Sequence, residues 1–250
     1  PRGRVHLIKS VAEGKISVNE QFTDPVFACL DCRACTTACP ANVDVGGLIE
    51  EARGQIRQAM PLTGWKGMIS KFFLKELFPH SHRLEAAGSL LKLYQKSGMQ
   101  KMVRTTGMLN MMPTHLAEME HVMPKITRSV RKKYKKERVL KAKAERKAEV
   151  AFLTGCIMDV MFSDINEATL NVLRRNGNDV VIPHSQTCCG ALHVHAGDRD
   201  MGRQLAKKNI EAFQHADTII VNAAGCGCML KEYPELFREE EQEWLEKAEV

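Results

Sequence analysis

The first 58 residues show the apolar periodicity of α-helices. Apolar side chains recur every three to four positions within Arg4–Glu13, and Gly14 ends that pattern. Residues 19–28 favour a second short helix, and residues 44–58 predict a third whose N-terminal aspartate can act as the cap. We therefore expect residues 1–58 to form an all-α module.

The next part of the chain, residues 59–147, is also helical in pattern and is rich in methionine and basic residues. Its stretch Trp65–Phe78 is amphipathic, and Trp65, Met68 and Phe72 can share one apolar stripe. Such a stripe either packs into a core or forms a surface for a membrane or a quinone. Because amphipathic helices are the norm in soluble folds, core packing is the favoured interpretation.

The last hundred residues contain three short apolar runs separated by helical patterns. The runs are residues 149–154, 179–183 and 217–221, and the helical patterns are residues 166–175 and 204–215. Strands and helices that alternate at this spacing predict a parallel α/β sheet over residues 148–250. The predicted fold class is therefore α plus α/β: an all-α ferredoxin-like module, a helical linker and a parallel-sheet domain.

The positive charge of the chain is local. The formal net charge is +6, and residues 131–147 alone carry ten lysines or arginines against two glutamates. The rest of the chain is slightly acidic, so nucleic acid is not an expected partner. The basic run favours a solvated helical or disordered connector over a contact with anionic lipid or an acidic partner.

The nine cysteines fall into two groups, at residues 29–39 and 156–228. The first group consists of Cys29, Cys32, Cys35 and Cys39. With the proline that follows, it has the C-x2-C-x2-C-x3-C-P spacing of bacterial ferredoxins, in which the first three cysteines bind one [4Fe–4S] cluster and the fourth binds another. Two-residue gaps let the loop curl so that successive sulfurs converge. We expect the same division of ligands here.

Zinc and disulfides are the alternatives for these cysteines. Zinc sites more often use two separated pairs of ligands. Disulfides need an oxidising compartment, and the sequence contains no secretory signal. A core that used cysteine as a small apolar residue would scatter the nine along the chain. The grouping therefore favours iron–sulfur ligation.

The second group of cysteines follows the three predicted strands. Its members are Cys156, Cys188, Cys189, Cys226 and Cys228. Ligands gather beyond the carboxyl ends of parallel strands, so we expect one shared metal site at that edge. The adjacent pair Cys188-Cys189 suits an unusual cluster or a bridged metal better than a tetrahedral zinc, and a vicinal disulfide is a minor alternative. Gly190, which follows the pair, allows a close backbone approach or a positive φ. His195 is either a further ligand or a structural histidine, and His193 is a weaker candidate.

Four segments of the chain resemble one family, the iron–sulfur subunits of glycolate oxidase. They are residues 1–9, 29–40, 187–195 and 224–233. The Cys-Cys-Gly array is also similar to the cysteine-rich CCG domain of heterodisulfide reductases. The resemblance implies ligands of a second centre at Cys156, Cys188, Cys189 and Cys226, and less firmly at Cys228 and His195. Heterodisulfide reductases have C-x-x-C where this chain has C-x-C, which weakens the match of Cys228.

The resemblance also implies a function. The chain is expected to be the electron-transfer subunit of a flavin-dependent 2-hydroxy-acid (glycolate) oxidase or dehydrogenase, relaying electrons from FAD-binding subunits toward quinone. Substrate oxidation would take place on the flavin subunit, so this chain is expected to carry no catalytic residue. The implied cofactors are a [4Fe–4S] cluster and a second iron–sulfur cluster in the CCG domain.

Two other functions compete with that one. The alternative enzyme is a heterodisulfide-reductase-like subunit with disulfide chemistry at the CCG cluster, and the third interpretation is a zinc-bound interaction protein. No apolar run approaches the roughly 18 residues of a membrane-spanning helix. The expected location is the cytoplasm, with peripheral contact at the inner face of the cell membrane. The family carries a second ferredoxin motif and a second CCG repeat, so we expect this chain to be a fragment.

Overall fold

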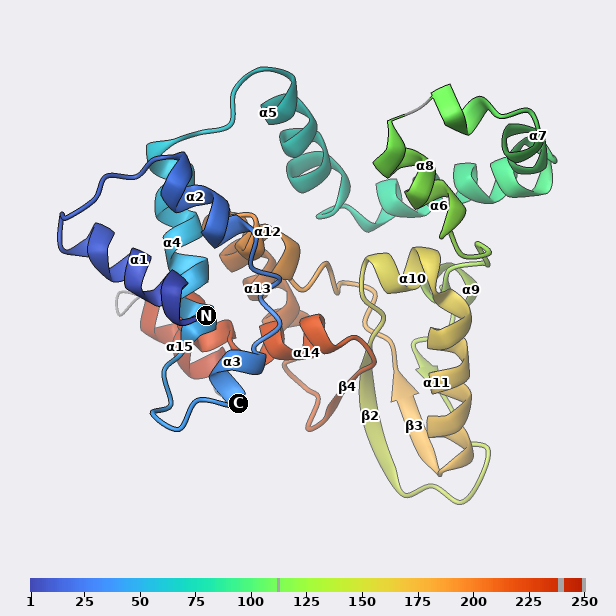
Figure 1. The fold of residues 1–250 in the computed structure, drawn as a ribbon. Coiled ribbons are helices and arrows are strands. Elements are labelled where there is room, and N and C mark those ends of the chain that lie inside the picture. The colour runs from blue at the N-terminus through green and yellow to red at the C-terminus, as the bar shows by residue number, and fades with distance from the viewer. Residues whose placement is uncertain (112, 238–240, 249–250) are drawn as a thin grey trace. The chain divides into compact units, whose positions relative to one another are not determined.

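The computed structural model of the chain describes residues 1–111, 113–237 and 241–248 (Figure 1). These residues divide into two compact units, each built from several segments of the chain. The first unit comprises residues 1–76, 189–207 and 228–250, and the second comprises residues 77–188 and 208–227. Sequence position alone therefore does not define a unit, since segments from the C-terminal half complete the N-terminal one.

The N-terminal part of the first unit is helical, as the sequence predicts. Its helices are α1 (Arg2–Ala12), α2 (Glu20–Phe27), α3 (Ala34–Thr37), α4 (Val45–Ala59) and α5 (Gly64–Lys71). The Asn19 side chain caps α2 through the Phe22 amide, and the Asp44 carboxylate caps α4 through the Gly47 amide. The apolar faces of α2 and α4 meet in a core whose buried members are Phe22, Val26, Val45, Ile49, Ala52 and Ile56.

The amphipathic stretch after α4 does not pack as the sequence suggests. Helix α5 continues into η1 (Phe72–Leu77), which has π-helical geometry. The side chains of Trp65 and Met68 are 67% and 68% exposed, and that of Phe72 is 55% exposed. The preferred expectation of core packing for this apolar stripe is therefore wrong, because the inward side of the segment is formed by other residues.

The second unit begins with a series of helices within the region that the sequence predicts to be helical. Its helices are α6 (Ser81–Lys96), α7 (Met99–Thr105), η2 (Met108–Met111), α8 (Thr114–His121) and α9 (Val130–Lys133). The basic run continues beyond α9 as strand β1 (Val139–Leu140), so residues 131–147 are not a free connector. Asp179 explains the difference, because its carboxylate accepts hydrogen bonds from Lys141, Arg146 and the backbone amide of Ala142. These contacts hold the pKa of Asp179 at about 2.

A four-stranded sheet completes the second unit, in the order β1-β3-β2-β4. The three predicted strands are present as β2 (Ala148–Leu153), β3 (Asn178–Val181) and β4 (Ile219–Val221). Strand β2 runs parallel to both β3 and β4, whereas β1 is antiparallel to β3. The expectation of a purely parallel sheet is therefore corrected to a mixed one. The sheet core includes Phe152, Leu170 and Val180, all fully buried.

The remaining helices follow the strands. They are α10 (Ile157–Met161), α11 (Ser163–Arg175), α12 (Ala191–His195), α13 (Arg199–Phe213), α14 (Ala224–Lys231), η3 (Tyr233–Leu236) and α15 (Gln242–Ala248). Helix α11 connects β2 to β3 and lies alongside them (Figure 1). Within the described residues, no helix is both long and apolar enough to cross a membrane.

Candidate functional site

The ferredoxin-like cysteines lie on a strongly curled loop between α2 and α4. Three residues of this loop, Asp31, Arg33 and Asn42, have φ angles of 55°, 59° and 51°. No other non-glycine residue among those described has a positive φ. Each such conformation costs on the order of 1–3 kcal/mol and persists only where the surroundings enforce it. The curled conformation of the cysteine loop therefore costs conformational free energy, which contacts with the rest of the unit must offset.

The loop presents its sulfurs in a setting that fits a cluster. Cys29 and Cys35 are half-buried and pack against the helical core, whereas Cys32 is exposed. The Asp31 amide donates to Cys29 Sγ at 3.4 Å, and the Val43 amide donates to Cys39 Sγ at the same distance. Amide hydrogen bonds to cysteine sulfur are one of the means by which proteins tune the potential of iron–sulfur clusters. Four cysteines on one curled, amide-lined loop suit a [4Fe–4S] cluster, and their role as ligands stays a prediction.

Arg53 of α4 anchors the start of the loop. Its buried guanidinium donates to the carbonyl oxygens of Val26 and Cys29, and also to the carbonyl oxygen of His195 on α12. One side chain thus joins the end of α2, the first cysteine and the segment after the Cys-Cys-Gly motif. This anchor satisfies the Cys29 carbonyl oxygen and fixes the backbone at the first cysteine.

Arg33, inside the cysteine loop, lies among three carboxylates. Its Nη1 donates to Asp31 Oδ1 at 2.8 Å, and its Nη2 donates to Glu50 Oε1 at 2.7 Å and to Glu232 Oε2 at 2.6 Å. These carboxylates raise the pKa of Arg33, although burial alone would lower it. The loop is therefore tied to α4 and to the residue after α14 through one charged side chain.

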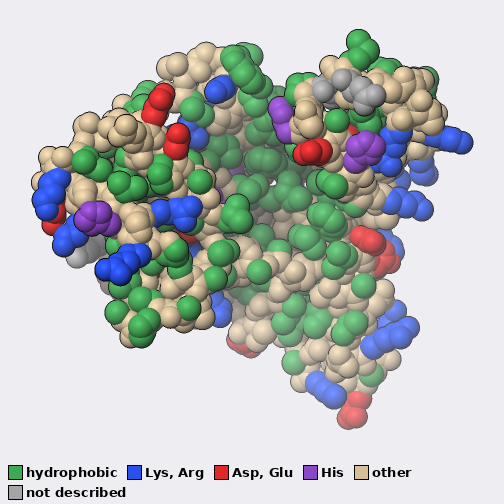
Figure 2. All heavy atoms as spheres, viewed as in Figure 1, with side chains coloured by type: hydrophobic (Ala, Val, Ile, Leu, Met, Phe, Trp, Pro, Cys, Tyr) green, Lys and Arg blue, Asp and Glu red, His purple; other side chains and the backbone are tan. Residues whose placement is uncertain are grey.

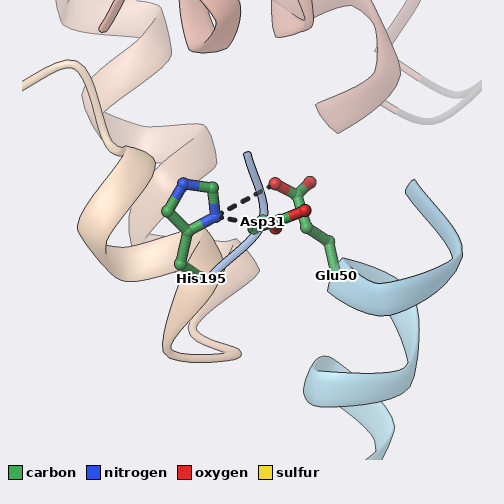
Figure 3. A group of neighbouring side chains, drawn as sticks. All are labelled: Asp31, Glu50 and His195. Atoms are coloured by element: carbon green, nitrogen blue, oxygen red, sulfur yellow. Dashed lines mark ion pairs between the residues drawn. The ribbon is translucent and has the colours of Figure 1, made fainter. Parts of the chain in front are cut away.

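His195 completes this cluster of charges. Its Nδ1 lies 3.0 Å from Asp31 Oδ2 and 3.2 Å from Glu50 Oε1 (Figure 3). The Asp31 carboxylate, followed by that of Glu50, raises the pKa of His195 to about 9. Burial raises the pKa of Asp31, but His195 and Arg33 together outweigh it and hold that pKa below its usual value. At neutral pH the histidine is therefore cationic.

The side chains of Asp31, Glu50 and His195 are close enough together to hold a metal ion. The negative charges of Asp31 and Glu50 are already balanced, however, because Arg33 and Arg53 form ion pairs with the same two carboxylates. A cation placed there would be repelled by two guanidinium groups. This cluster is therefore best described as an ion-pair network that supports the cysteine loop.

We predict that His195 makes stability depend on pH. A pKa raised from 6.5 to about 9 adds stability below pH 6.5, and that contribution is lost as the pH rises through about 9. The upper limit of this contribution to the free energy of unfolding is about 3 kcal/mol. Thermal unfolding from pH 6 to 10 should show this loss, and His195→Gln should flatten it. An equal loss in the variant would show that other groups cause it.

The second group of cysteines follows the carboxyl ends of the parallel strands, as predicted. Cys156 comes three residues after β2, Cys188 lies in the loop after β3, and Cys226 lies in α14 after β4. Cys156 Sγ and Cys188 Sγ are 3.5 Å apart, and neither is in a disulfide. Two strand ends thus bring two predicted ligands together. Cys189 is buried next to Cys188, and Cys228 is exposed.

A buried amide network holds the loops that carry these cysteines. Gln186 accepts from the Thr154 amide at 2.8 Å and donates to the Phe152 carbonyl oxygen at 3.1 Å, which ties the loop after β3 to the end of β2. Asn166 donates to the Thr154 carbonyl oxygen, and Asn222, after β4, donates to Asn166. All three strand ends are therefore connected by side-chain amides.

Two further contacts position the Cys-Cys-Gly turn itself. Asn209 donates to the Cys188 carbonyl oxygen at 3.0 Å, and the Tyr233 hydroxyl donates to the Cys189 carbonyl oxygen at 2.9 Å. Gly190 has the positive φ expected of it, at 94°, and a Cβ there would lie 3.3 Å from the Gly202 carbonyl oxygen. The turn thus needs glycine both for its backbone angle and for its close neighbour.

Several of these supporting residues were missed by sequence reasoning. Glu50 and Arg53 are each 3% exposed within the apolar pattern of α4. Charged residues among buried apolar positions were the available signal, because buried charges are almost always paired. Gln186, Asn166 and Asn222 gave no such signal, since their partners are backbone and side-chain groups that are well separated from them in sequence.

Comparison with known proteins shows two family descriptions and several relatives that this chain matches. The family description "Glycolate oxidase iron-sulfur subunit, linker region" matches residues 65–123, and "Cysteine-rich domain" matches residues 150–231. The chain is 45% identical, over 99% of its length, to a probable glycolate oxidase iron–sulfur subunit of Bacillus subtilis (strain 168), and covers 56% of that protein. This chain is similar to glycolate oxidase iron–sulfur subunits.

Other relatives show how far the similarity extends. The glycolate oxidase iron–sulfur subunit of Escherichia coli (strain K12) is 28% identical over 95% of this chain, which covers 53% of that protein. Lactate utilization protein A of a Geobacillus strain (WCH70) is 33% identical over 40% of this chain, which covers 42% of that protein. The chain thus spans about half the length of these relatives. No solved structure matches it.

Proposed function

We propose that this chain is the electron-transfer iron–sulfur subunit of a flavin-dependent 2-hydroxy-acid oxidase, with glycolate as substrate. The observation that carries this proposal is the curled loop of four ferredoxin-spaced cysteines, held by Arg33 and Arg53. Relatives named as glycolate oxidase iron–sulfur subunits support it, and relatives named for lactate utilization support the same class of substrate.

Each group of cysteines has a part in the proposal. Cys29, Cys32 and Cys35 would hold a [4Fe–4S] cluster, with Cys39 as its fourth ligand or as a ligand of a further cluster. Cys156, Cys188, Cys189 and Cys226 would hold a second centre, with Cys228 as its outer candidate. His195 pairs with Asp31 and Glu50 instead, so we do not propose it as a ligand. When bound, such clusters supply one-electron transfer, and the flavin subunit accepts the hydride from the substrate.

The residues around the loop would prepare it for electron transfer. Arg53 and Arg33 fix the backbone that carries the first three cysteines, so little reorganisation is needed when an electron arrives or leaves. In this proposal residues 1–58 form the cluster module, residues 59–147 the linker and residues 148–250 the CCG domain.

Quinone is the acceptor that we propose. A cavity of about 510 Å³ in the first unit is within the range of small-molecule sites. Its apolar lining includes Leu62, Leu74 and Phe237, and Arg57 and Lys71 can donate hydrogen bonds to carbonyl oxygens. It borders the exposed segment α5, so an acceptor dissolved in a membrane would have a short path to it.

Reduction by substrate tests this function. The reconstituted chain is mixed anaerobically with the flavin-containing subunits of a glycolate oxidase, and glycolate is added. The visible absorption of the clusters should bleach within turnover time, and a quinone analogue should restore it. Bleaching by glycolate only when the flavin subunits are present supports the relay. Oxidation of the reduced chain by a heterodisulfide, with no response to glycolate, would refute it.

A further inference from the structure

The segment α5–η1 displays an apolar face to solvent. Trp65, Met68, Ile69 and Phe72 are 67%, 68%, 44% and 55% exposed. At the helical repeat these four side chains fall within an arc of about 100°. Figure 2 shows apolar side chains at the surface over α5. The sequence pattern identified this stripe but not its exposure.

The opposite side of the same segment is fixed to the first unit. Gly67 is buried, and a Cβ there would lie 2.4 Å from the Leu62 carbonyl oxygen. His193 Nε2 lies 2.6 Å from the carbonyl oxygen of Leu74. The segment therefore cannot turn its apolar face inward without breaking these contacts.

Basic residues border the apolar arc on both sides. Lys66 lies beyond one edge of the arc, and Lys71 and Lys75 lie beyond the other, while Glu76 is the single acidic residue of residues 60–76. An interfacial helix has this composition: aromatic and aliphatic residues on one face, lysines at its borders and a tryptophan at headgroup depth. The lysines attract an anionic surface and would repel the same face of a second copy of this chain.

We propose that the Trp65–Phe72 face docks this chain on an anionic lipid bilayer. The inference deepens the proposed function, since it names the surface that would bring the subunit to a membrane-dissolved acceptor. Docking needs no cluster and no flavin subunit, so its test is independent of the electron-transfer test.

Tryptophan fluorescence tests this proposal directly. The chain has two tryptophans, and Trp244 stacks on Phe237, so Trp244→Phe leaves Trp65 as the reporter. Vesicles of phosphatidylcholine with phosphatidylglycerol should shift its emission to the blue and carry the protein upward in a flotation gradient. Vesicles of phosphatidylcholine alone should do so weakly, and added salt should weaken the anionic case.

Substitutions then assign the effect to this face. Met68→Ser with Phe72→Ser should weaken vesicle binding about tenfold or more, because two apolar side chains no longer leave water. Val172→Ser, at a side chain on α11 that is 57% exposed, is the matched control and should bind as the parent does. Lys66→Gln with Lys71→Gln should remove most of the preference for anionic vesicles.

Three results would overturn the proposal. The first is equal binding by the Met68→Ser, Phe72→Ser variant and the parent. The second is a blue shift that rises with protein concentration in the absence of vesicles, which would assign the face to a second copy. The third is a shift seen with the flavin subunit and not with any vesicle, which would assign it to a protein partner.

Discussion

Replacing Cys32 with serine should remove the cluster of the ferredoxin-like loop. Serine is nearly isosteric with cysteine, but its hydroxyl is a far poorer iron ligand than a thiolate. Because Cys32 is exposed, the substitution should leave the folded protein intact. We expect the anaerobically reconstituted variant to lose about four irons per chain and most of the loop's charge-transfer absorption.

The control for this prediction is Cys228→Ser. Cys228 is also exposed, lies outside the loop, and is the least firmly placed of the expected ligands. The Cys228→Ser variant should keep the iron of the ferredoxin-like loop. Equal iron content in the Cys32→Ser variant and the parent, or equal losses in both variants, would contradict the assignment of the loop as a cluster site.

Replacing Arg33 with leucine should have the second largest effect. Asp31, Glu50 and Glu232 would then remain close together without the guanidinium that bonds to all three. Removing one partner from a buried ionic network typically costs about 3–5 kcal/mol. We expect a loss of this size in anaerobic denaturant unfolding of the first unit, together with faster loss of iron from the neighbouring loop.

Two further variants separate charge from shape at this position. Arg33→Lys keeps the charge but not the forked geometry, so it should recover part of the stability. Combining Arg33→Leu with Glu50→Gln removes one of the carboxylates left without Arg33 and should also recover part of it. If Arg33→Leu unfolds as the parent does, the network is not what holds the loop.

Sequence reasoning succeeded where one local pattern decided the outcome. The cap at Asp44, the three parallel strands and the positive φ of Gly190 each depend on a few neighbouring residues. The exposed apolar face at Trp65 shows the limit of such patterns, because helical periodicity gives the faces of a helix but not the one that is buried.

The remaining differences come from contacts between distant residues. Strand β1 is held in place by hydrogen bonds to the Asp179 carboxylate. The donors are Lys141, Arg146 and the Ala142 amide, about 35 residues away in sequence. His195, expected near the second cysteine group, instead has its Nδ1 against Asp31 of the first. Nothing in the spacing of either motif indicates that contact, so its discovery required the three-dimensional structure.

Metal analysis with Mössbauer spectroscopy tests the central claim most directly. The chain is reconstituted anaerobically with iron-57 and sulfide in the presence of equimolar zinc, and is then desalted. The account predicts the signal of a [4Fe–4S] cluster with about four irons at the ferredoxin-like loop and additional iron that Cys188→Ser removes. Stoichiometric zinc with no iron–sulfur signal would contradict it.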